Sequence, residues 1–548
     1  MRSRLKARLG GALNLVAAVV ILGGLLFGGI QGAGPLPPLG PLLNPGTGVW
    51  TTAFDAQLPT TQALHLAGWQ QPVQVTFDAN GTAHITAATD HDLFMTIGYL
   101  HGTFRLTQMD LERRQGEGLL SQVIGKAALG SDQFELQLGL RRTAEQEWAL
   151  LAPSDPARAI LEEYSAGVNA AITQQRQSGH LPVMFKLLGY EPEPWTPLDT
   201  LVVKGIMTQT LDFSSGPLHM ALLAKALGEE QAEQLFPIIP ANEQHPYDLG
   251  PYHSDGVAPL AGSTGASARA SDGQGVSAGE ATAASSLLTR IAALPPSAIH
   301  FDSNSNNWAV DGSKTASGKP LLAGDPHLAQ TLPAIWYQLD ANSPGYHVAG
   351  VSIPGTPVVL IGHNQHISWS LTNTQNSATL YYKEQTDSAH PHQYFWRGAW
   401  QDMKATHYAI PVKGRAPVAL TVEETAHGPI MTLDGQTMSV WWVGAAASQD
   451  LRVLLDIGRA SNFSEFRDAL RDWHAPSQNF VYADDQGNIG LISAGYYPIV
   501  PSGAKPWLPL PGDGSADVLG TIPFDDIPQV YNPPSHFVFS ANQREVGP

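Results

Sequence analysis

Apolar and polar positions follow different patterns along the two halves of the chain. Residues 73–77 (VQVTF) alternate as in a β-strand, and residues 78–81 (DANG) have the composition of a turn. From residue 90 to residue 114 the apolar side chains keep helical spacing, and glycines follow directly. These patterns predict a strand, a turn and a long helix.

Two later segments of the first half also predict helices. One begins near Ser154, a candidate N-cap, and carries Pro156 in its first turn, where a missing N–H is tolerated. The other covers residues 217–236. Residues 34–252 are therefore predicted to be mostly helical, after a linker rich in proline and glycine at 34–48.

The composition changes most sharply between about residues 253 and 296. This stretch includes GSTGASARASDGQGVSAGEATAASS, whose side chains are mostly small and polar. Such a segment is too small and polar to bury anything, so residues 253–304 are predicted to be a disordered or removable spacer.

Short strand-like runs separated by turns follow the spacer. They include NNWAVDG, PLLAGD, AIWYQLD, YHVAGVSI, PVVLIGH, HISWSLTN, QYFWRG, VALTVEE and MSVWWVG. A helix is predicted at residues 462–473, where Asn462 and Glu465 have the spacing of a capping box. Consecutive strands with an inserted helix predict antiparallel sheets with helices packed on them, which is an α+β fold.

Composition and charge exclude several classes of function. The chain has 548 residues with 43% hydrophobic composition, enough for two to four domains or one large one. Its 54 glycines and 42 prolines, with 14% charged residues, favour a β-rich body with many turns. The net charge of −18 argues against nucleic-acid binding. The absence of cysteine excludes thiolate nucleophiles, disulfides, iron–sulfur clusters and Cys-ligated zinc.

Residues 1–33 have the pattern of an export segment, in which basic residues precede an uncharged apolar run. The run approaches the ~20 residues needed to span a bilayer, and no clear A-x-A site follows. The segment is therefore expected to be either a cleaved signal peptide or a membrane anchor at residues 9–30. In either case the body is expected to be exported, and so secreted or anchored outside the cytoplasm. A buried core helix is the weaker interpretation, because no polar residues mark a solvent-facing side.

The stretch FDSNSNNWAV at residues 301–310 places two serines after the spacer and at the start of a strand-like run. If the peptide bond before such a serine is cut, its α-amine, with a pKa near ~8, lies close to its own Oγ. The amine can then act as the general base. An oxyanion hole of N–H donors, worth ~3 to 4 kcal/mol per donor, would complete the site. By this chemistry alone, Ser303 and Ser305 are both candidate nucleophiles.

Several segments together carry a family resemblance. They are SNNWAVDGSKTASGKPLLAGDPHLAQTLPAIWYQ (305–338), GHNQHISWSLTN (362–373), PSQNFVYADDQGNIGLISAGYYP (476–498), ITAATDHDLFMTIGYLHGTFRLTQMDLERR (85–114) and YNPPSHFVFSANQREVG (531–547). They resemble the penicillin acylase family of N-terminal-nucleophile (Ntn) amidohydrolases, which includes penicillin, cephalosporin and acyl-homoserine lactone acylases. The resemblance covers nearly everything from 70 to 548 apart from the spacer.

This resemblance implies an Ntn-hydrolase fold, a four-layer αββα sandwich. It also implies an exported precursor that cuts itself into a helical α-chain and a β-chain, which remain together as a heterodimer. Residues 305–548 would form the β-chain core. Family members normally continue beyond the point that matches Pro548, so we expect either a fragment or a shortened fold.

The resemblance also separates the two serines. The family's nucleophile opens the pattern Ser-Asn-x-Trp, which Ser305 fits through Trp308 and Ser303 does not fit. Ser305 is therefore the implied nucleophile, and the bond between Asn304 and Ser305 is the implied cleavage site. His327 matches a position at which cephalosporin and lactone acylases carry a histidine beside the nucleophile, which implies a supporting catalytic role.

Two asparagines match the oxyanion-hole positions of the family. The backbone N–H of Asn373 is the first implied donor, with the N–H of Thr374 next to it as the alternative. The side chain of Asn479 matches the second donor. A turn or cap role is the other interpretation for both asparagines.

Four aliphatic residues, Met207, Leu211, Leu328 and Ile361, match acyl-pocket positions that are largely aromatic in the penicillin G type. Aliphatic walls accommodate flexible chains, whereas flat rings suit a phenylacetyl group. We therefore expect a preference for an aliphatic N-acyl chain, as in acyl-homoserine lactones. The alternative is that these side chains simply pack the core.

The chain departs from the family pattern in two places. Ile499 and Val500 stand where the family usually carries an Arg. Pro217, Ser377 and Leu380 stand where some members bind calcium through three carboxylates. Because hard cations need several oxygen ligands, we expect no calcium there and no other cofactor.

The function implied by the resemblance is hydrolysis of the linear amide bond of a small N-acyl compound, of β-lactam antibiotic or acyl-homoserine lactone type. The alternative is an exported binding or scaffold protein that keeps the acylase fold without processing or catalysis, and the missing Arg and calcium ligands favour it somewhat. Other signatures are weak. SGAK at 502–505 lacks the companion motifs of penicillin-binding proteins. The histidine pairs of GHNQH and HPH lack a carboxylate at helical spacing.

Overall fold

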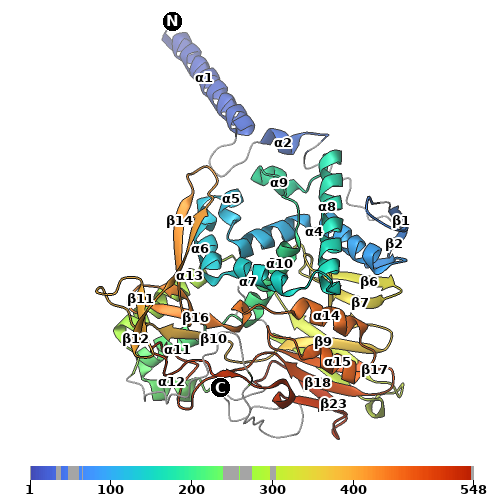
Figure 1. Cartoon of the computed structure of the whole chain (residues 1–548). Coiled ribbons are helices and arrows are strands. Elements are labelled where there is room, and N and C mark those ends of the chain that lie inside the picture. Colours follow the sequence, from blue (N-terminus) through green and yellow to red (C-terminus); the bar gives the residue numbers. More distant parts are fainter. Residues whose placement is uncertain are drawn as a thin grey trace.

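The computed structural model combines helices with three main sheets (Figure 1). It describes residues 2–31, 39–46, 48, 61–64, 66–238, 258, 275–295 and 304–544. Helix α1 (Arg2–Gln31) extends away from the body, and the short helix α2 (Leu39–Leu43) follows it. Among the residues described, no helix, α1 included, is both long and apolar enough to cross a membrane.

The largest sheet has ten strands in the order β1-β2-β3-β6-β7-β8-β9-β17-β18-β22. In that order their bounds are Thr61–Leu64, Val73–Phe77, Ala83–Thr86, Tyr337–Ser343, Tyr346–Ser352, Val359–His363, Ile367–Asn373, Gln478–Asp484, Ile489–Ala494 and Gln529–Tyr531. Its pairings are antiparallel except for that between β3 and β6. This parallel pairing joins the helical half to the strand-rich half.

Helices cover one face of this sheet and share one apolar core with it. The principal ones are α4 (Asp90–Glu117), α8 (Pro156–Ser178), α10 (Pro197–Asp212), α14 (Asp450–Arg459) and α15 (Phe463–Leu470). Shorter helices complete the helical half: α5 (Leu120–Ile124), α6 (Leu129–Leu138), α7 (Leu140–Leu150) and α9 (Val183–Leu188). Within the described residues, this half of the chain is mostly helical.

The observed ends of the helices can be compared with the capping residues expected from the sequence. Helix α4 begins as expected, and Gly118, with φ +68°, ends it. The N-cap of α8 is Asp155 and not Ser154, because the Asp155 carboxylate accepts a hydrogen bond from the backbone nitrogen of Ala157 (2.9 Å). In α15, Asn462 is the N-cap as expected, but the Glu465 carboxylate accepts from the backbone nitrogen of Ser461 (2.8 Å), and the helix ends at Leu470, short of residue 473.

The single helix expected at residues 217–236 is two helices, α11 (Gly216–Leu227) and α12 (Glu229–Leu235). The break lies at Gly228, whose φ of +86° is compatible with glycine and not with a continued helix. Part of the expected spacer is also structured, since α13 (Ala278–Ala292) lies within it. The interpretation that this stretch buries nothing is therefore wrong for α13. Its inner face is buried through small or branched residues at 283, 284, 287 and 291.

Helices α11 and α13 pack on a six-stranded sheet with the order β13-β14-β15-β16-β10-β20. Its strands are Lys404–Ile410, Val418–Thr425, Gly428–Thr432, Met438–Trp442, Thr379–Lys383 and Leu510–Pro511. The structure also contains two small two-stranded ribbons. One pairs β11 (Gln393–Trp396) with β12 (Ala399–Asp402), and the other pairs β19 (Pro498–Ile499) with β21 (Gly520–Thr521).

A three-stranded sheet, β23-β4-β5, packs against β17 and β18 of the large sheet. Its strands are Phe537–Ser540 (β23), Asn304–Val310 (β4) and Leu321–His327 (β5). The described residues thus supply a helical layer and two sheet layers. The outer face of the three-stranded sheet exposes Trp308, Leu321 and Phe537, so the described part of the chain does not supply the fourth layer that the resemblance implies.

Candidate active site

Strand β4 carries Ser305 into the space between the two packed sheets. Strand alternation turns Ser305 and Asn307 toward the large sheet and leaves Trp308 on the outer face. The side chain of Asn307 fixes this arrangement, because its Nδ2 donates to the carbonyls of Ser370 (3.3 Å) and Asn479 (3.1 Å). Ser305 is consequently only 8% exposed.

Asn542, two residues after β23, holds the backbone nitrogen of Ser305. This nitrogen donates a hydrogen bond to Oδ1 of Asn542. The Nδ2 of Asn542 donates to the carbonyl of Asn373 (2.6 Å), and its backbone nitrogen donates to Oγ of Ser540 (3.2 Å). Asn542 has φ +64°, a conformation that Asn tolerates better than most residues. Sequence reasoning gave it no role, although it lies in the SANQ run of the last matching segment.

Asn479 lies fully buried on β17 and belongs to the same hydrogen-bond network. Its Nδ2 donates to Oγ of Ser540 (2.9 Å), which also accepts from Asn542. Its Oδ1 accepts from Oγ of Ser493 (2.5 Å). The amide nitrogen of Asn479 therefore points toward β23, the neighbour of the strand that carries Ser305.

The structure distinguishes the two backbone donors expected at the end of β9, the N–H groups of Asn373 and Thr374. The N–H of Thr374 donates to the carbonyl of Ser477 (3.2 Å). Because consecutive N–H groups of a strand point to opposite sides, the N–H of Asn373 points away from β17. The Asn373 side chain is fixed by donation to the carbonyl of Leu211 (2.5 Å) and by acceptance from Nε2 of Gln478. Asn373 also lines the same pocket as Ser305, so it is the better placed of the two donors.

The structure does not bring His327 beside Ser305. In the register of β4 with β5, Ser305 lies opposite Pro326, and Asn304 lies opposite His327. Because successive side chains of a strand alternate between its faces, His327 lies on the outer face while Ser305 points inward. Its Nε2 lies 2.9 Å from Oδ2 of Asp325, and the ring is 43% exposed. The expected position next to the nucleophile is therefore wrong for the intact chain.

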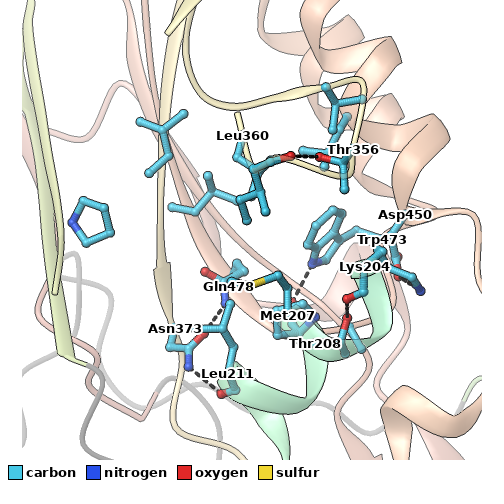
Figure 2. Close-up of a pocket in the computed structure, with 18 of the residues that line it drawn as sticks. Lys204, Met207, Thr208, Leu211, Thr356, Leu360, Asn373, Asp450, Trp473 and Gln478 are labelled. Carbon is cyan, nitrogen blue, oxygen red and sulfur yellow. Dashed lines mark hydrogen bonds and ion pairs between the residues drawn. The ribbon is translucent and has the colours of Figure 1, made fainter. Parts of the chain in front are cut away.

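An apolar pocket is lined by Ser305 and by all four expected acyl-pocket residues. Figure 2 shows this pocket with Met207 and Leu211 in its wall. Met207 and Leu211 come from α10, Ile361 comes from β8, and Leu328 follows β5. The cavity volume is about 90 Å³. Sequence reasoning missed other wall residues, among them Trp336, Leu371, Leu454 and Trp473.

Two charged residues, Lys204 of α10 and Asp450 of α14, also line this pocket. The Nζ of Lys204 donates to Oε1 of Glu147 (2.5 Å) and to Oγ of Ser448 (3.1 Å), and it lies 3.5 Å from Oδ2 of Asp450. Burial raises the pKa of the Glu147 carboxyl. Burial lowers the pKa of Lys204, but the two carboxylates raise it by more. Lys204 lies three residues before Met207 and so on the same face of α10, and this spacing could have indicated Lys204 as a pocket residue from the sequence.

Three of the positions that depart from the family pattern lie within regular structure. Pro217 is buried on α11, and Leu380 is buried in an apolar cluster. In the described parts of the chain, no group of three or more His, Asp or Glu residues is arranged to hold a metal ion. The absence of calcium at Pro217, Ser377 and Leu380 stays a prediction. Ile499 pairs with Gly520 in the small ribbon of β19 and β21.

Comparison with known proteins finds several acylases. The chain is 30% identical over 517 residues to the acyl-homoserine lactone acylase QuiP of Pseudomonas aeruginosa, covering 90% of this chain and 57% of that protein. It is 28% identical over 520 residues to the penicillin acylase 2 proenzyme of Pseudomonas sp. SE83 (90% and 61% covered). It is 27% identical over 509 residues to penicillin G acylase of Escherichia coli (86% and 59% covered). The chain thus spans 57 to 61% of the length of these relatives.

One solved structure, a thermostable penicillin G acylase from Alcaligenes faecalis, matches 44% of each chain at 30% identity. Its TM-score of 0.42 is too low to support an argument about the fold. The sequence profile of the penicillin amidase family matches residues 72–548, a range that includes α10, β4 and the pocket between them. Because this match covers most of the chain, the protein belongs to the penicillin amidase family.

Proposed function

We propose that this protein is an amidohydrolase that cleaves the linear amide bond of small N-acyl compounds after cutting its own chain between Asn304 and Ser305. The position of Ser305 carries the proposal. Its backbone nitrogen is held by Asn542, and the residue lines an apolar pocket. Membership of the penicillin amidase family supports amide hydrolysis as the reaction class.

The first step is cleavage of the precursor. Oγ of Ser305 attacks the carbonyl carbon of Asn304, the C–N bond breaks, and an ester forms between the two residues. Water then hydrolyses the ester, which leaves a carboxylate on Asn304 and an α-amine with a restored hydroxyl on Ser305. An α-amine has a pKa near ~8, so part of it is neutral near neutral pH and can accept a proton.

The second reaction uses this new terminus. Oγ of Ser305 attacks the acyl carbon of the substrate while its proton passes to the α-amine and then to the leaving amine as the C–N bond breaks. Water, deprotonated by the same α-amine, then releases the carboxylic acid. The N–H of Asn373 and the Nδ2 of Asn479 would stabilise the oxyanion, at ~3 kcal/mol for each donor. No cofactor is needed.

The acyl group is proposed to be aliphatic. Met207, Leu211, Leu328 and Ile361 contribute flexible, non-aromatic side chains to the wall, and these accommodate an alkyl chain better than a flat ring. The names of the relatives indicate acyl-homoserine lactone and penicillin amides as the substrate types to test.

We also propose that the protein is exported and works as two associated fragments. The basic residues before the apolar run of residues 1–33 support export. Pairing of β3 with β6, and the hydrogen bond from Asn373 to Leu211, connect segments on the two sides of the proposed cut. The proenzyme name of the SE83 relative is consistent with processing.

A second candidate is an exported binding or scaffold protein that is neither processed nor catalytic. Ile499 and Val500, at the positions where the family usually carries an Arg, favour it.

Mass spectrometry of the purified protein tests both candidates. An active enzyme should contain a subunit that begins Ser-Asn-Asn-Trp. The Ser305→Ala variant should remain one chain, whereas Ser303→Ala, the matched control, should be cut normally. Cleavage of Ser305→Ala between 304 and 305 would rule out self-processing through Ser305. An uncut wild-type chain without amidase activity would favour the binding protein.

A further inference from the structure

We propose that Lys204, held by Glu147 and Asp450, closes the far end of the acyl pocket and restricts the substrate to acyl chains of medium length. The inference rests on the proposed function, because it concerns the acyl group of the same reaction. It adds a specificity determinant that neither the family resemblance nor the names of the relatives supply.

The pocket follows one face of α10. Lys204, Met207, Thr208 and Leu211 are spaced i, i+3, i+4 and i+7, so they lie along one side of the helix. At a rise of ~1.5 Å per residue, Lys204 and Leu211 are about 10 Å apart along the helix axis.

Leu211 marks the catalytic end of this face. Its carbonyl accepts a hydrogen bond from Nδ2 of Asn373 (2.5 Å), and the carbonyl of Asn373 accepts from Asn542, which holds Ser305. Figure 2 shows Lys204 and Asp450 on the opposite side of the pocket from Asn373 and Leu211. The acyl carbon would therefore lie near Leu211, and the end of the acyl chain would approach Lys204.

The wall between the two ends offers a chain mainly apolar contacts. The hydroxyl of Thr208 donates to the carbonyl of Lys204 (3.0 Å), and the hydroxyl of Thr356 donates to the carbonyl of Ile353 (3.0 Å). Both hydroxyls are thus used within the protein. Of the described residues in the lining, Lys204 and Asp450 are the charged ones.

The charged end is also fixed in place. Ser448, whose Oγ accepts from Lys204, connects the two carboxylates. Its Oγ lies 2.5 Å from Oδ2 of Asp450, to which it donates, and its backbone nitrogen donates to Glu147 (3.2 Å). Asp450 further accepts from the backbone nitrogen of His474 (2.7 Å). An alkyl chain that pushed Lys204 aside would leave buried carboxylates unpaired, which is strongly unfavourable.

The distance of about 10 Å between Lys204 and Leu211 along the axis of α10 sets the length of the acyl chain that fits. Carbon–carbon bonds are ~1.5 Å long and zigzag, so about eight carbons of an extended chain fit in 10 Å. One methylene too many in a closed apolar pocket typically lowers specificity by roughly tenfold or more. The proposed preference is therefore for octanoyl-like chains, with a steep loss for chains that are several carbons longer.

The test compares aminomethylcoumarin amides of hexanoic, octanoic, decanoic, dodecanoic and tetradecanoic acids. The wild-type kcat/KM should be highest for octanoyl and fall at least tenfold by dodecanoyl. The Lys204→Met/Glu147→Leu double variant removes Lys204 together with its nearer carboxylate partner, while Asp450 keeps its hydrogen bonds from Ser448 and from the backbone nitrogen of His474. Its ratio of dodecanoyl to octanoyl kcat/KM should rise at least tenfold. Lys204→Arg lengthens the charged side chain and should move the optimum to hexanoyl.

The matched control is Lys225→Met/Glu230→Leu, which makes the same changes at exposed positions and should leave the profile unchanged. The protein can also be titrated with the free carboxylic acids of the same lengths while tryptophan fluorescence is recorded. Binding should change the emission of Trp336 and Trp473 in the pocket wall, so the dependence of affinity on chain length is measured without hydrolysis. If the wild type cleaved none of the amides, the proposed function would fail while this titration still tested the pocket. An unchanged length profile in both folded Lys204 variants, by either readout, would overturn the inference.

Discussion

The side-chain amide of Asn542 holds the nitrogen of Ser305 that becomes the catalytic α-amine in the proposed mechanism. Its Oδ1 accepts from that nitrogen, and its Nδ2 donates to the carbonyl of Asn373, an expected oxyanion residue. One side chain thus positions the proposed base and ties it to the proposed oxyanion hole before the chain is cut.

Replacing Asn542 should impair catalysis more than binding. The variant Asn542→Gly keeps the residue's positive φ without strain, because glycine tolerates that conformation. Loss of the oriented base should lower kcat about a hundredfold. KM should change less than threefold, since Asn542 does not line the acyl pocket. Steady-state kinetics on octanoyl amides measure both constants, and Asn80→Gly in an exposed turn is the matched control.

The variant Asn542→Asp separates positioning from a merely structural role. A carboxylate beside the protonated α-amine stabilises its charge, so the amine pKa should rise by about one unit. The acidic limb of the kcat/KM profile should then move to higher pH by the same amount. An acidic limb at the wild-type position in a folded Asn542→Asp enzyme would contradict the assignment.

Local patterns in the sequence predict the elements, because their signals lie within a few residues. The spacing of apolar residues from 90 to 114 predicts α4, which ends at Glu117 beside the glycine expected to stop it. The expected spacer was harder to interpret because two of the four residues that α13 buries are alanines, whose small side chains resemble those of a disordered segment. Composition alone does not separate these two cases.

The geometry of the proposed site depends on contacts between distant residues. Asn542 and Ser305 are 237 residues apart, so no local pattern connects them. For His327, the family resemblance gave a matching position, but the register of β4 with β5 decides which face its ring occupies. The pocket residues Met207 and Leu211 were accessible to sequence reasoning, because helical spacing and family position both indicate them.

The flexible pocket side chains Met207, Leu211, Leu328 and Ile361 should select an alkyl chain over a phenylacetyl group. We expect the wild-type kcat/KM for an octanoyl amide to exceed that for the matching phenylacetyl amide at least tenfold. Met207→Ala removes a wall contact and should lower kcat/KM for octanoyl about tenfold. Met184→Ala, at a methionine that is 37% exposed, should have no effect. Faster cleavage of phenylacetyl by the wild type would refute the aliphatic preference.

A buried histidine makes the stability of the protein depend on pH. Nδ1 of His427 lies 2.9 Å from Oε1 of Glu384, and Nε2 lies 2.8 Å from Oδ1 of Asp517. Burial lowers the pKa of His427, but hydrogen bonds and charge from Asp517 and Glu384 raise it to about 9. An unfolded histidine has a pKa near ~6.5. The folded state therefore binds this proton more tightly than the unfolded state.

The resulting stabilisation is complete below about pH 6.5 and is lost as the pH rises through about 9. His427→Gln should reduce the free energy of unfolding by on the order of 3 kcal/mol at pH 6. The difference from the wild type should shrink by pH 10. Urea unfolding at both pH values measures this, with the exposed His407→Gln as control. An equal deficit at the two pH values would exclude the proton as its source.

Helices α4 and α8 cross where glycines allow their backbones to touch. A Cβ on Gly167 would lie 1.8 Å from the carbonyl oxygen of Met95, and one on Gly98 would lie 2.1 Å from that of Tyr164. The Gly167→Ala variant must therefore separate the helices over the core that they share with the large sheet. Overpacking of this kind should reduce the free energy of unfolding by about 3 kcal/mol.

The matched control for this prediction is Gly130→Ala in α6. A Cβ there would meet nothing within 4 Å, so only the gain in helix propensity remains, and the free energy of unfolding should rise by about 0.5 to 1 kcal/mol. The two substitutions add the same methyl group to a helix, yet their effects should have opposite signs. The urea midpoints of unfolding of the two variants test this prediction. Similar shifts in the same direction would mean that the close helix crossing does not control stability.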